Sequence, residues 1–408
     1  MRIKLCVLFG GKSVEHEVSV ISALQAIGSL DKAKYDVVPV YITKNSEFYT
    51  SFECSCIEEY KNIPALIKKS ERCVLMNEDG KVRLLRYPFK KHGGVISDVD
   101  VAFPIVHGTN VEDGTLQGYL KTLGLPFVGC DVTASAVGMD KYVMKTVLKE
   151  NGIPVLDCVR FYASEFSDPE AVLDRAEDKL TYPVIVKPVN LGSSVGISVA
   201  HDRQELKACL EDGFRYASAV LCEKAITDLT EINCSVLGDT SSAEASELEK
   251  PFKHDEILSF KDKYEGPSGG GSKGGAKGGA KSAGAGMASL QRQIPAPVSP
   301  ERREEIRSLA VKAFQCLGCN GVSRIDFMID GDTDTVYLNE INTIPGSLSF
   351  YLWEPLGVKY TELLDRMIEL ALKRRREEDA ITFSFDTNIL ENFAGGAKGS
   401  KGAKGSKR

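Results

Sequence analysis

Two short segments near residue 330 carry oxygen-bearing side chains at a spacing that suits a divalent cation. Residues 323–326 (Ser-Arg-Ile-Asp) and 339–342 (Asn-Glu-Ile-Asn) are predicted strands, and the stretch between them predicts a hairpin loop at 331–335. A hairpin symmetric about residue 333 places Asp326 opposite Glu340, and the alternation of side chains along a strand puts Asn342 on the same face. Such ligands suit Mg²⁺ that bridges nucleotide phosphates. The alternative is the polar face of an edge hairpin, in which the two carboxylates would repel each other without a cation.

A glycine- and serine-rich loop follows the predicted strand 184–188. Its sequence, Gly-Ser-Ser-Val-Gly at 192–196, lets backbone N–H groups approach phosphate oxygens, and Lys187 supplies positive charge beside it. The pattern is not a Walker motif, because no Gly-x-x-x-x-Gly-Lys-Ser/Thr leads into a helix. An ordinary hairpin loop explains this segment equally well when it is taken alone.

Polar loops also follow two predicted strands in the N-terminal part of the chain. Gly10-Gly11 and Glu15 come after the strand 3–9, and His107 comes after the strand 99–106. Ligands bind at the carboxyl ends of strands in α/β sheets, so Glu15 is a candidate for holding a cationic amine. Helix capping is an equally good interpretation of each loop, and a lone histidine is usually structural.

Lysines provide the remaining candidates for anion binding. Lys141 lies at the start of the predicted helix 140–151, and Lys261 and Lys263 lie just before Tyr264. Lysines are most often surface charge, so none of these carries a function on its spacing alone.

The elements that position these residues alternate between apolar strands and helical segments, which is typical of sheets covered by helices. We expect three domains: an α/β domain with a parallel sheet at 1–137, a compact domain at 138–228, and a third domain at 229–380. The other expected elements are strands at 37–42, 197–200, 220–223, 231–237 and 335–341, and helices at 203–213, 300–317 and 360–376.

Glycine is unevenly distributed along the chain. Fifteen of the 37 glycines lie in 266–293 and 395–408, which together carry nine Lys or Arg and no acidic residue. The net charge is −6, so the remaining residues carry −15. An acidic body of this kind argues against a generally basic nucleic-acid-binding protein. We expect an insert at 266–293 in the third domain and a disordered basic tail at 381–408.

Other sequence features concern the compartment of the protein. No run of about 18 apolar residues is present, which excludes a membrane span. The apolar start of the chain runs into Gly10-Gly11 rather than a small-residue cleavage site, so it predicts a first strand and not a signal peptide. The eleven cysteines are odd in number and scattered, which favours reduced thiols in a cytoplasmic protein.

Taken together and in this order, the motifs resemble those of the D-alanine–D-alanine ligase family within the ATP-grasp superfamily. The resemblance covers about residues 3–375 apart from the insert. Each motif alone is modest, whereas eight in register are highly specific. The matching segments are 9–19, 107–118, 129–136 with 139–141, 182–188, 192–196, 223–224, 323–326 and 339–346.

The resemblance implies a fold of mixed α/β and α+β class, with an ATP-grasp fold behind the N-terminal parallel-sheet domain. It also implies that ATP lies between the second and third domains with two Mg²⁺ ions, which Mn²⁺ can replace. The nucleotide-binding residues that it implies are Lys141, Lys187, Ser194, Glu223, Lys224, Glu231 and Lys263, and the implied metal ligands are Asp326, Glu340 and Asn342.

The same resemblance implies roles around the reacting groups. Glu15, Ser193 and Tyr264 match a hydrogen-bonded trio, in which Glu15 also holds the ammonium group of the first D-alanine. His107 matches a residue near that substrate, and Tyr351 and Leu352 match the substrate-binding segment. Arg324 and the backbone N–H of Gly346 match the donors that stabilise a tetrahedral oxyanion.

The activity implied by the resemblance is the ATP-dependent joining of two D-alanine molecules through an acyl phosphate, for peptidoglycan synthesis. Family members are commonly homodimers in the cytoplasm, and the reaction requires no nucleic acid and no membrane. The segment 266–293 directly follows Lys263 and Tyr264 and so falls on the active-site lid of the family. It is either a tolerated insertion, because doubling a loop costs only about 0.6 kcal/mol, or a source of lysines that contact the triphosphate.

Three alternatives remain open on the sequence alone. Phe350 and Tyr351 replace smaller or polar residues that are usual in the family, so D-serine or another D-amino acid is a second candidate for the second substrate. D-Lactate is disfavoured because Tyr264 is absent from the depsipeptide-forming relatives. A different ATP-grasp carboxylate–amine ligase would not need Glu15, Ser193 and Tyr264 together, and a non-catalytic binder of anionic polymers would not need the metal and phosphate residues.

Overall fold

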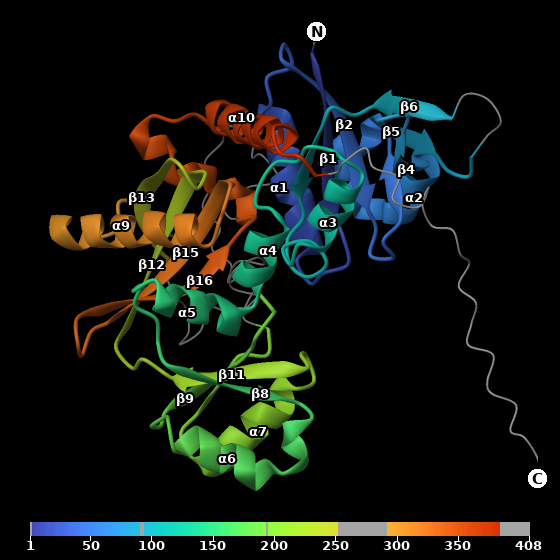
Figure 1. The fold of residues 1–408 in the computed structure, drawn as a ribbon. Helices are drawn as coiled ribbons and strands as arrows, with labels where there is room; N and C mark the ends of the chain where they lie inside the picture. The colour runs from blue at the N-terminus through green and yellow to red at the C-terminus, as the bar shows by residue number, and fades with distance from the viewer. Residues whose placement is uncertain (1, 90–93, 193–194, 252–291, 384–408) are drawn as a thin grey trace, which may run out of the picture.

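The structure is a computed structural model that describes residues 2–89, 94–192, 195–251 and 292–383. Three sheets follow one another along this part of the chain (Figure 1). Within the same residues, no helix combines the length and the apolar character needed to cross a membrane. All eleven cysteines are free thiols.

The first sheet has seven strands in the order β6-β5-β4-β3-β2-β1-β7. β1 pairs in parallel with β2 and β7, whereas the strands from β3 to β6 pair antiparallel. The predicted parallel sheet is therefore confirmed for three strands only. The two-residue turn Asp79-Gly80, with both φ angles positive, joins β4 directly to β5, and so short a connection can link only antiparallel strands. The strands are β1 (Ile3–Gly10), β2 (Tyr35–Ile42), β3 (Phe48–Thr50), β4 (Glu71–Glu78), β5 (Lys81–Arg86), β6 (Val95–Asp98) and β7 (Val101–Ile105).

Helices cover this sheet, and one of them comes from the far end of the chain. β1 reads as an almost continuous apolar run because neither of its faces is open to water. Helix α10 (Tyr360–Asp379) buries Leu363, Leu364 and Met367 in the same core cluster as β1, so it connects the third part of the chain to the first. The other helices here are α1 (His16–Ser29), η1 (Phe52–Ser55), η2 (Ile57–Asn62), α2 (Ile63–Lys69) and α3 (Thr115–Thr122).

The second sheet is antiparallel, with strand order β10-β9-β11-β8, and the helices α6 and α7 pack on one of its faces (Figure 1). The predicted succession of strand, loop, strand, helix and strand is confirmed, while β8 and α6 were not predicted. The elements are β8 (Cys158–Tyr162), η3 (Glu165–Ser167), α6 (Pro169–Glu177), β9 (Val184–Pro188), β10 (Ser198–Ala200), α7 (Arg203–Gly213) and β11 (Ala219–Lys224).

The third sheet has the order β14-β13-β12-β15-β16 and presents two different faces. One face buries apolar residues such as Ile232 and Phe327 against Phe314 of α9, in a cluster that also includes Met144 of α5. The opposite face carries the polar pair Asn233 and Asp326. Asn339 on this face accepts a hydrogen bond from Lys187 of the second sheet, so the polar face is directed toward that sheet. The elements are α4 (Val132–Met139), α5 (Lys141–Glu150), β12 (Leu229–Gly238), β13 (Ala243–Pro251), β14 (Arg292–Gln293), α9 (Pro300–Cys316), β15 (Gly321–Asp330), β16 (Thr335–Asn342), η5 (Gly346–Leu352) and η6 (Glu354–Leu356).

Candidate active site

The β15–β16 hairpin brings together the carboxylates that the sequence places on it. Asp326 pairs with Glu340 as predicted. A β-bulge interrupts the pairing of the two strands next to this pair, between Asp326 and Phe327. On the turn side of the bulge Phe327 pairs with Leu338, so Asn339 is the extra residue on β16.

The bulge changes which residues of β16 share a face. Leu338 and Ile341 are both buried in the core although they are three residues apart, which regular alternation does not allow. Asn339, Glu340 and Asn342 therefore lie on the opposite, polar face of the sheet, and β16 contributes three polar side chains where a regular strand would offer two.

Positively charged side chains already contact both carboxylates. Arg324 donates from Nε and Nη2 to the two oxygens of Asp326, each at 2.7 Å, and Asn342 Nδ2 donates to Asp326 Oδ2 at 3.1 Å. Lys141 Nζ lies 3.4 Å from Glu340 Oε2. Burial alone would lower the pKa of Arg324, but the neighbouring Asp326 raises it well above its ordinary value. These contacts offset the repulsion between the two facing carboxylates.

Lys141 is positioned by the start of helix α5. Asp140 caps the helix, because its Oδ1 accepts from the backbone N–H groups of Tyr142 and Val143, both at 3.0 Å. The capped start holds Lys141 as the first helical residue, where its Nζ donates to Leu191 O at 2.7 Å. Lys141 thus bridges the loop after β9 and the carboxylate of Glu340.

A buried triad of charges lies between the second and third sheets. Lys187 on β9 and Lys145 on α5 both pair with Glu223 on β11, and Lys145 Nζ lies 2.6 Å from Glu223 Oε2. Lys187 Nζ also donates to Asn339 Oδ1 at 3.2 Å, so it reaches the bulge of the third sheet. Burial opposes the charged form of Glu223, but the two lysines outweigh it and lower the pKa of Glu223 to about 2.

This triad should make stability depend on pH in the acid range. The pKa of Glu223 is lowered from 4.5 to about 2 in the folded protein, so its stabilising contribution is present above pH 4.5 and is lost as the pH falls toward 2. We expect the free energy of unfolding of Glu223→Gln to vary less steeply with pH across this window, by up to about 1.4 kcal/mol per pH unit. Urea unfolding of both proteins between about pH 6 and about pH 3 measures the difference. Parallel pH profiles would contradict it.

The other residues implied to bind a nucleotide lie around this triad. Lys224 is exposed at the end of β11, and Glu231 on β12 pairs with Met328, on the same sheet face as Asn233 and Asp326. Ser193, Ser194, Lys263 and Tyr264 lie outside the described residues, as does nearly all of the 266–293 insert.

Glu15 stands where three loops meet. It directly precedes α1, and its carboxylate lies close to the loops after β7 and β9, at Gly108 and Gly192. A Cβ on Gly108 would lie 2.9 Å from Glu15 Oε2, and one on Gly192 would lie 3.4 Å from it. Glu15, Glu112, Lys141, Glu340 and Asn342 line one small cavity. The structure therefore brings residues of all three predicted parts of the chain to one place.

His107 is buried, and both ring nitrogens make internal hydrogen bonds. Nδ1 lies 2.7 Å from Ile344 O, which can only accept, so Nδ1 carries the proton, and Nε2 accepts from Ser22 Oγ at 3.0 Å. Ser22 Oγ in turn accepts from Ser347 N at 2.9 Å. Burial lowers the pKa of His107, which favours this neutral tautomer. His107 thus ties α1 to Ile344, and Ser22 of α1 binds the backbone of Ser347 in the segment that begins at Gly346.

Glu112 is a site residue that the sequence reasoning missed. Its two oxygens accept from Gly108 N at 2.7 Å and from Ile344 N at 3.1 Å, which joins the loop after β7 to the loop after β16. Burial, together with the nearby charge of Glu15, raises the pKa of Glu112 to about 8. Nothing in the sequence distinguishes it from the neighbouring Asp113.

Tyr351 and Leu352, which the resemblance implies bind substrate, lie in different environments at the end of η5. Tyr351 lies in a polar cluster, where its hydroxyl donates to Glu249 Oε1 at 3.3 Å and the guanidinium of Arg292 lies 3.9 Å from its ring centre. Leu352 is fully buried in the core cluster of the first sheet. The Leu352 side chain is thus part of that core, and the predicted contact of Leu352 with substrate, for which its backbone is available, stays a prediction.

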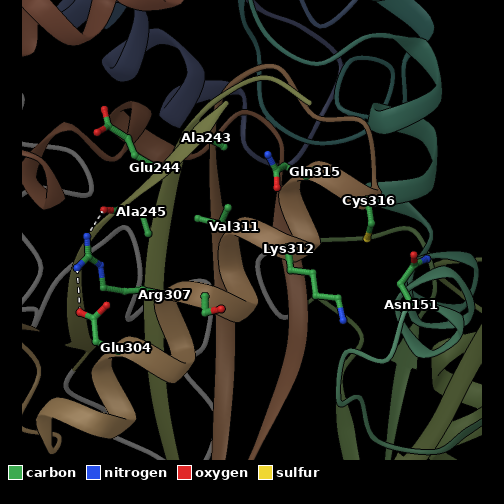
Figure 2. Close-up of a pocket in the computed structure, with 11 residues that line it drawn as sticks. Asn151, Ala243, Glu244, Ala245, Glu304, Arg307, Val311, Lys312, Gln315 and Cys316 are labelled. Carbon is green, nitrogen blue, oxygen red and sulfur yellow. Dashed lines mark hydrogen bonds and ion pairs between the residues drawn. The ribbon is translucent and has the colours of Figure 1, made fainter. Parts of the chain in front are cut away.

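A separate open groove of about 860 Å³ lies between α9, β13 and the end of α5 (Figure 2). Arg307 spans part of it and donates to Ala245 O at 2.8 Å, while Lys312 points into the open part. Among the residues that the structure describes, none predicted to bind substrate, nucleotide or metal lines this groove.

The second and third sheets, joined by the hydrogen bond from Lys187 to Asn339, make up an ATP-grasp fold behind the N-terminal α/β domain that the first sheet forms. Two family models match the chain: the D-ala D-ala ligase N-terminus over residues 4–130, and the D-ala D-ala ligase C-terminus over residues 147–275 and 280–369. The chain belongs to the D-ala D-ala ligase family, which confirms the resemblance seen in the sequence motifs.

Individual relatives agree with this assignment. The chain is 41% identical over 386 residues to a D-alanine–D-alanine ligase of Thermoanaerobacter sp., covering 92% of this chain and 98% of the relative. The solved D-alanine–D-alanine ligase of Coxiella burnetii superposes with a TM-score of 0.75 at 29% identity, covering 93% and 96% of the two chains. The D-Ala:D-Ser ligase VanG of Enterococcus faecalis superposes with a TM-score of 0.74 at 29% identity, covering 91% and 100%.

Proposed function

We propose that this protein joins two D-alanine molecules into D-alanyl-D-alanine for peptidoglycan synthesis, at the expense of ATP and through an acyl phosphate. The observation that carries the proposal is the convergence of Glu15, Lys141, Glu340 and Asn342 on one cavity in a chain of this family. A carboxylate that can hold an ammonium group, a lysine for phosphate and oxygen ligands for a cation are what such a reaction needs in one place.

The nucleotide is proposed to lie between the second and third sheets. Lys141 and Lys187 contact its phosphates, and the strand that carries Glu223 and Lys224 lies along the adenine, with Glu231 at the ribose. The buried charge of Lys187 and its contact with Asn339, next to Glu340, support this placement. Ser194 and Lys263 complete the set by resemblance.

The residues of the hairpin fit Mg²⁺. No group of three or more His, Cys, Asp or Glu side chains in the described ranges is arranged to hold a metal by itself. Asp326, Glu340 and Asn342 supply hard oxygen ligands and leave other positions to phosphate oxygens and water, which is how proteins usually bind Mg²⁺ beside a nucleotide. When bound, the ions would neutralise charge on the transferring phosphoryl group. We propose two Mg²⁺ ions, replaceable by Mn²⁺.

The chain's own residues then orient the reacting groups. Glu15, with Ser193 and Tyr264, holds the ammonium group of the first D-alanine beside His107, whose neutral ring keeps the segment 344–347 in place. Arg324 and the backbone N–H of Gly346 stabilise the oxyanion that forms when the second amine attacks. Such preorganised donors act before the charge develops and need no reorganisation during the reaction.

The second substrate is bound at the segment after Gly346, near Tyr351 and the backbone of Leu352. We place D-alanine there. The almost equal TM-scores of a D-alanine–D-alanine ligase and a D-Ala:D-Ser ligase, 0.75 and 0.74, mean that the fold alone does not separate D-serine from D-alanine. We further propose a homodimer in the cytoplasm that needs no nucleic acid.

A product assay tests the proposed function. The purified chain, with ATP and Mg²⁺, is given D-alanine alone, D-alanine with D-serine, and D-alanine with D-lactate, and the products are identified by mass. We expect D-alanyl-D-alanine with D-alanine alone and as the main product of each mixture. A mixed product that dominates would reassign the second site, and no ATP use with any pair would reject the proposal.

A further inference from the structure

Lys145 is a buried lysine to which the proposed function assigns no role. Only 3% of its side-chain surface is exposed, although lysine is among the residues least often buried. It follows Lys141 by four residues on α5, so both side chains project from the same face of that helix. This spacing is the sequence signal that could have identified it.

The contacts of Lys145 define what it does locally. Its ammonium group lies 2.6 Å from Glu223 Oε2, and Lys187 pairs with Glu223 Oε1. Each oxygen of this fully buried carboxylate therefore pairs with a different lysine. The two lysines differ in what else they reach. Lys187 also contacts Asn339, beside the metal ligand Glu340, and so faces the nucleotide side of the triad.

The net charge of Lys145, Lys187 and Glu223 explains why the second lysine is needed. Lys187 and Glu223 alone form a neutral pair, and a buried lysine already neutralised by a carboxylate attracts a phosphate group only weakly. Lys145 brings the triad to a net charge of +1 inside a region of low dielectric, where charge interactions are stronger than in water. The carboxylate then holds both lysines in place while one positive charge remains for an anion.

We propose that Lys145 is a positioning residue for nucleotide binding: it neutralises Glu223 so that the charge of Lys187 stays available to the phosphates of ATP. Lys145 itself does not touch the nucleotide. The inference rests on the proposed function, because it assumes that a nucleotide phosphate lies beside Lys187.

The test compares the binding of a charged and an uncharged ligand to the full chain. Calorimetry with ADP and Mg²⁺, and separately with adenosine, is carried out on the wild type, Lys145→Met and Lys145→Arg. We expect Lys145→Met to weaken ADP binding about tenfold, which is about 1.4 kcal/mol, with adenosine binding unchanged. Lys145→Arg should bind ADP within about threefold of the wild type, because it keeps the charge. Equal losses for ADP and adenosine would indicate a purely structural role and overturn the inference.

A double variant keeps the inference falsifiable if Lys145→Met alone fails to fold. Removing the carboxylate as well, in Lys145→Met/Glu223→Gln, frees Lys187 from its partner. We expect this protein to bind ADP within about twofold of Glu223→Gln, so that the loss of Lys145 no longer matters. A further tenfold loss in the double variant would show that Lys145 acts without Glu223 and would reject the inference. A wild type that binds neither ligand would instead reject the proposed function.

Discussion

Replacing Glu340 by glutamine is expected to lower kcat at least about a thousandfold, which is a barrier increase of about 4 kcal/mol. The amide keeps the shape of the side chain but removes one of the two carboxylates that we propose as metal ligands on the hairpin. In the wild-type hairpin the charge of Glu340 lies opposite Asp326 in the register of the two strands. The effect should fall on phosphoryl transfer, where metal ions neutralise charge, and the Mg²⁺ concentration needed for half-maximal rate should rise.

The stability of this variant should not fall with its activity. Neutralising Glu340 relieves its repulsion with Asp326, which offsets the loss of the ion pair with the buried Lys141. Lys141 also keeps its hydrogen bond to Leu191 O. Thermal unfolding should stay within a few degrees of the wild type. The matched control is Glu362→Gln at an exposed position of α10, which should leave kcat unchanged. A kcat for Glu340→Gln within tenfold of the wild type would contradict its role as a metal ligand.

Replacing Arg324 by lysine is expected to lower the rate of dipeptide formation by about 10²–10³-fold, the usual loss when one oxyanion donor is removed. Arginine donates to Asp326 through two parallel hydrogen bonds of 2.7 Å, and the single ammonium of lysine cannot reproduce this fork. The donor is therefore displaced, although the positive charge beside Asp326 is kept.

The ratio of products separates this effect from a general loss of function. Arg324 is proposed to act when the amine attacks, after the phosphoryl group has been transferred, so an acyl phosphate formed in the variant has time to react with water. We expect Arg324→Lys to release more ADP than dipeptide, whereas the wild type and the exposed control Arg376→Lys should release equal amounts. Equal amounts of ADP and dipeptide released by Arg324→Lys, however slow the reaction, would place the role of Arg324 before the amine attack.

The β15–β16 hairpin shows what local sequence can predict about this site. The alternation of side chains and the length of the loop were enough to place Asp326 opposite Glu340. The β-bulge at Asn339 could not be predicted, because it depends on Leu338 and Ile341 both packing into a core shared with α9. The bulge adds Asn339 to the polar face and thereby provides the contact to Lys187.

Contacts between distant segments account for most of what the sequence could not provide. Glu112 and His107 both bond to the backbone of Ile344, more than 200 residues further along the chain, and no local pattern encodes such pairings. Likewise, the amphipathic pattern of α10 predicted a helix correctly, but the pattern cannot say that its apolar face packs on the first sheet. The burial of Leu352 follows from the same packing.

The most direct test of the central claim follows the oxygen atoms of the substrate. D-Alanine labelled with ¹⁸O in both carboxylate oxygens is converted with unlabelled ATP, and the released phosphate is analysed by mass. If the carboxylate attacks the γ-phosphoryl group and the amine then displaces phosphate, each phosphate must carry one ¹⁸O atom and each new peptide carbonyl must keep one. Unlabelled phosphate, released together with a dipeptide or without one, would contradict ligation through an acyl phosphate.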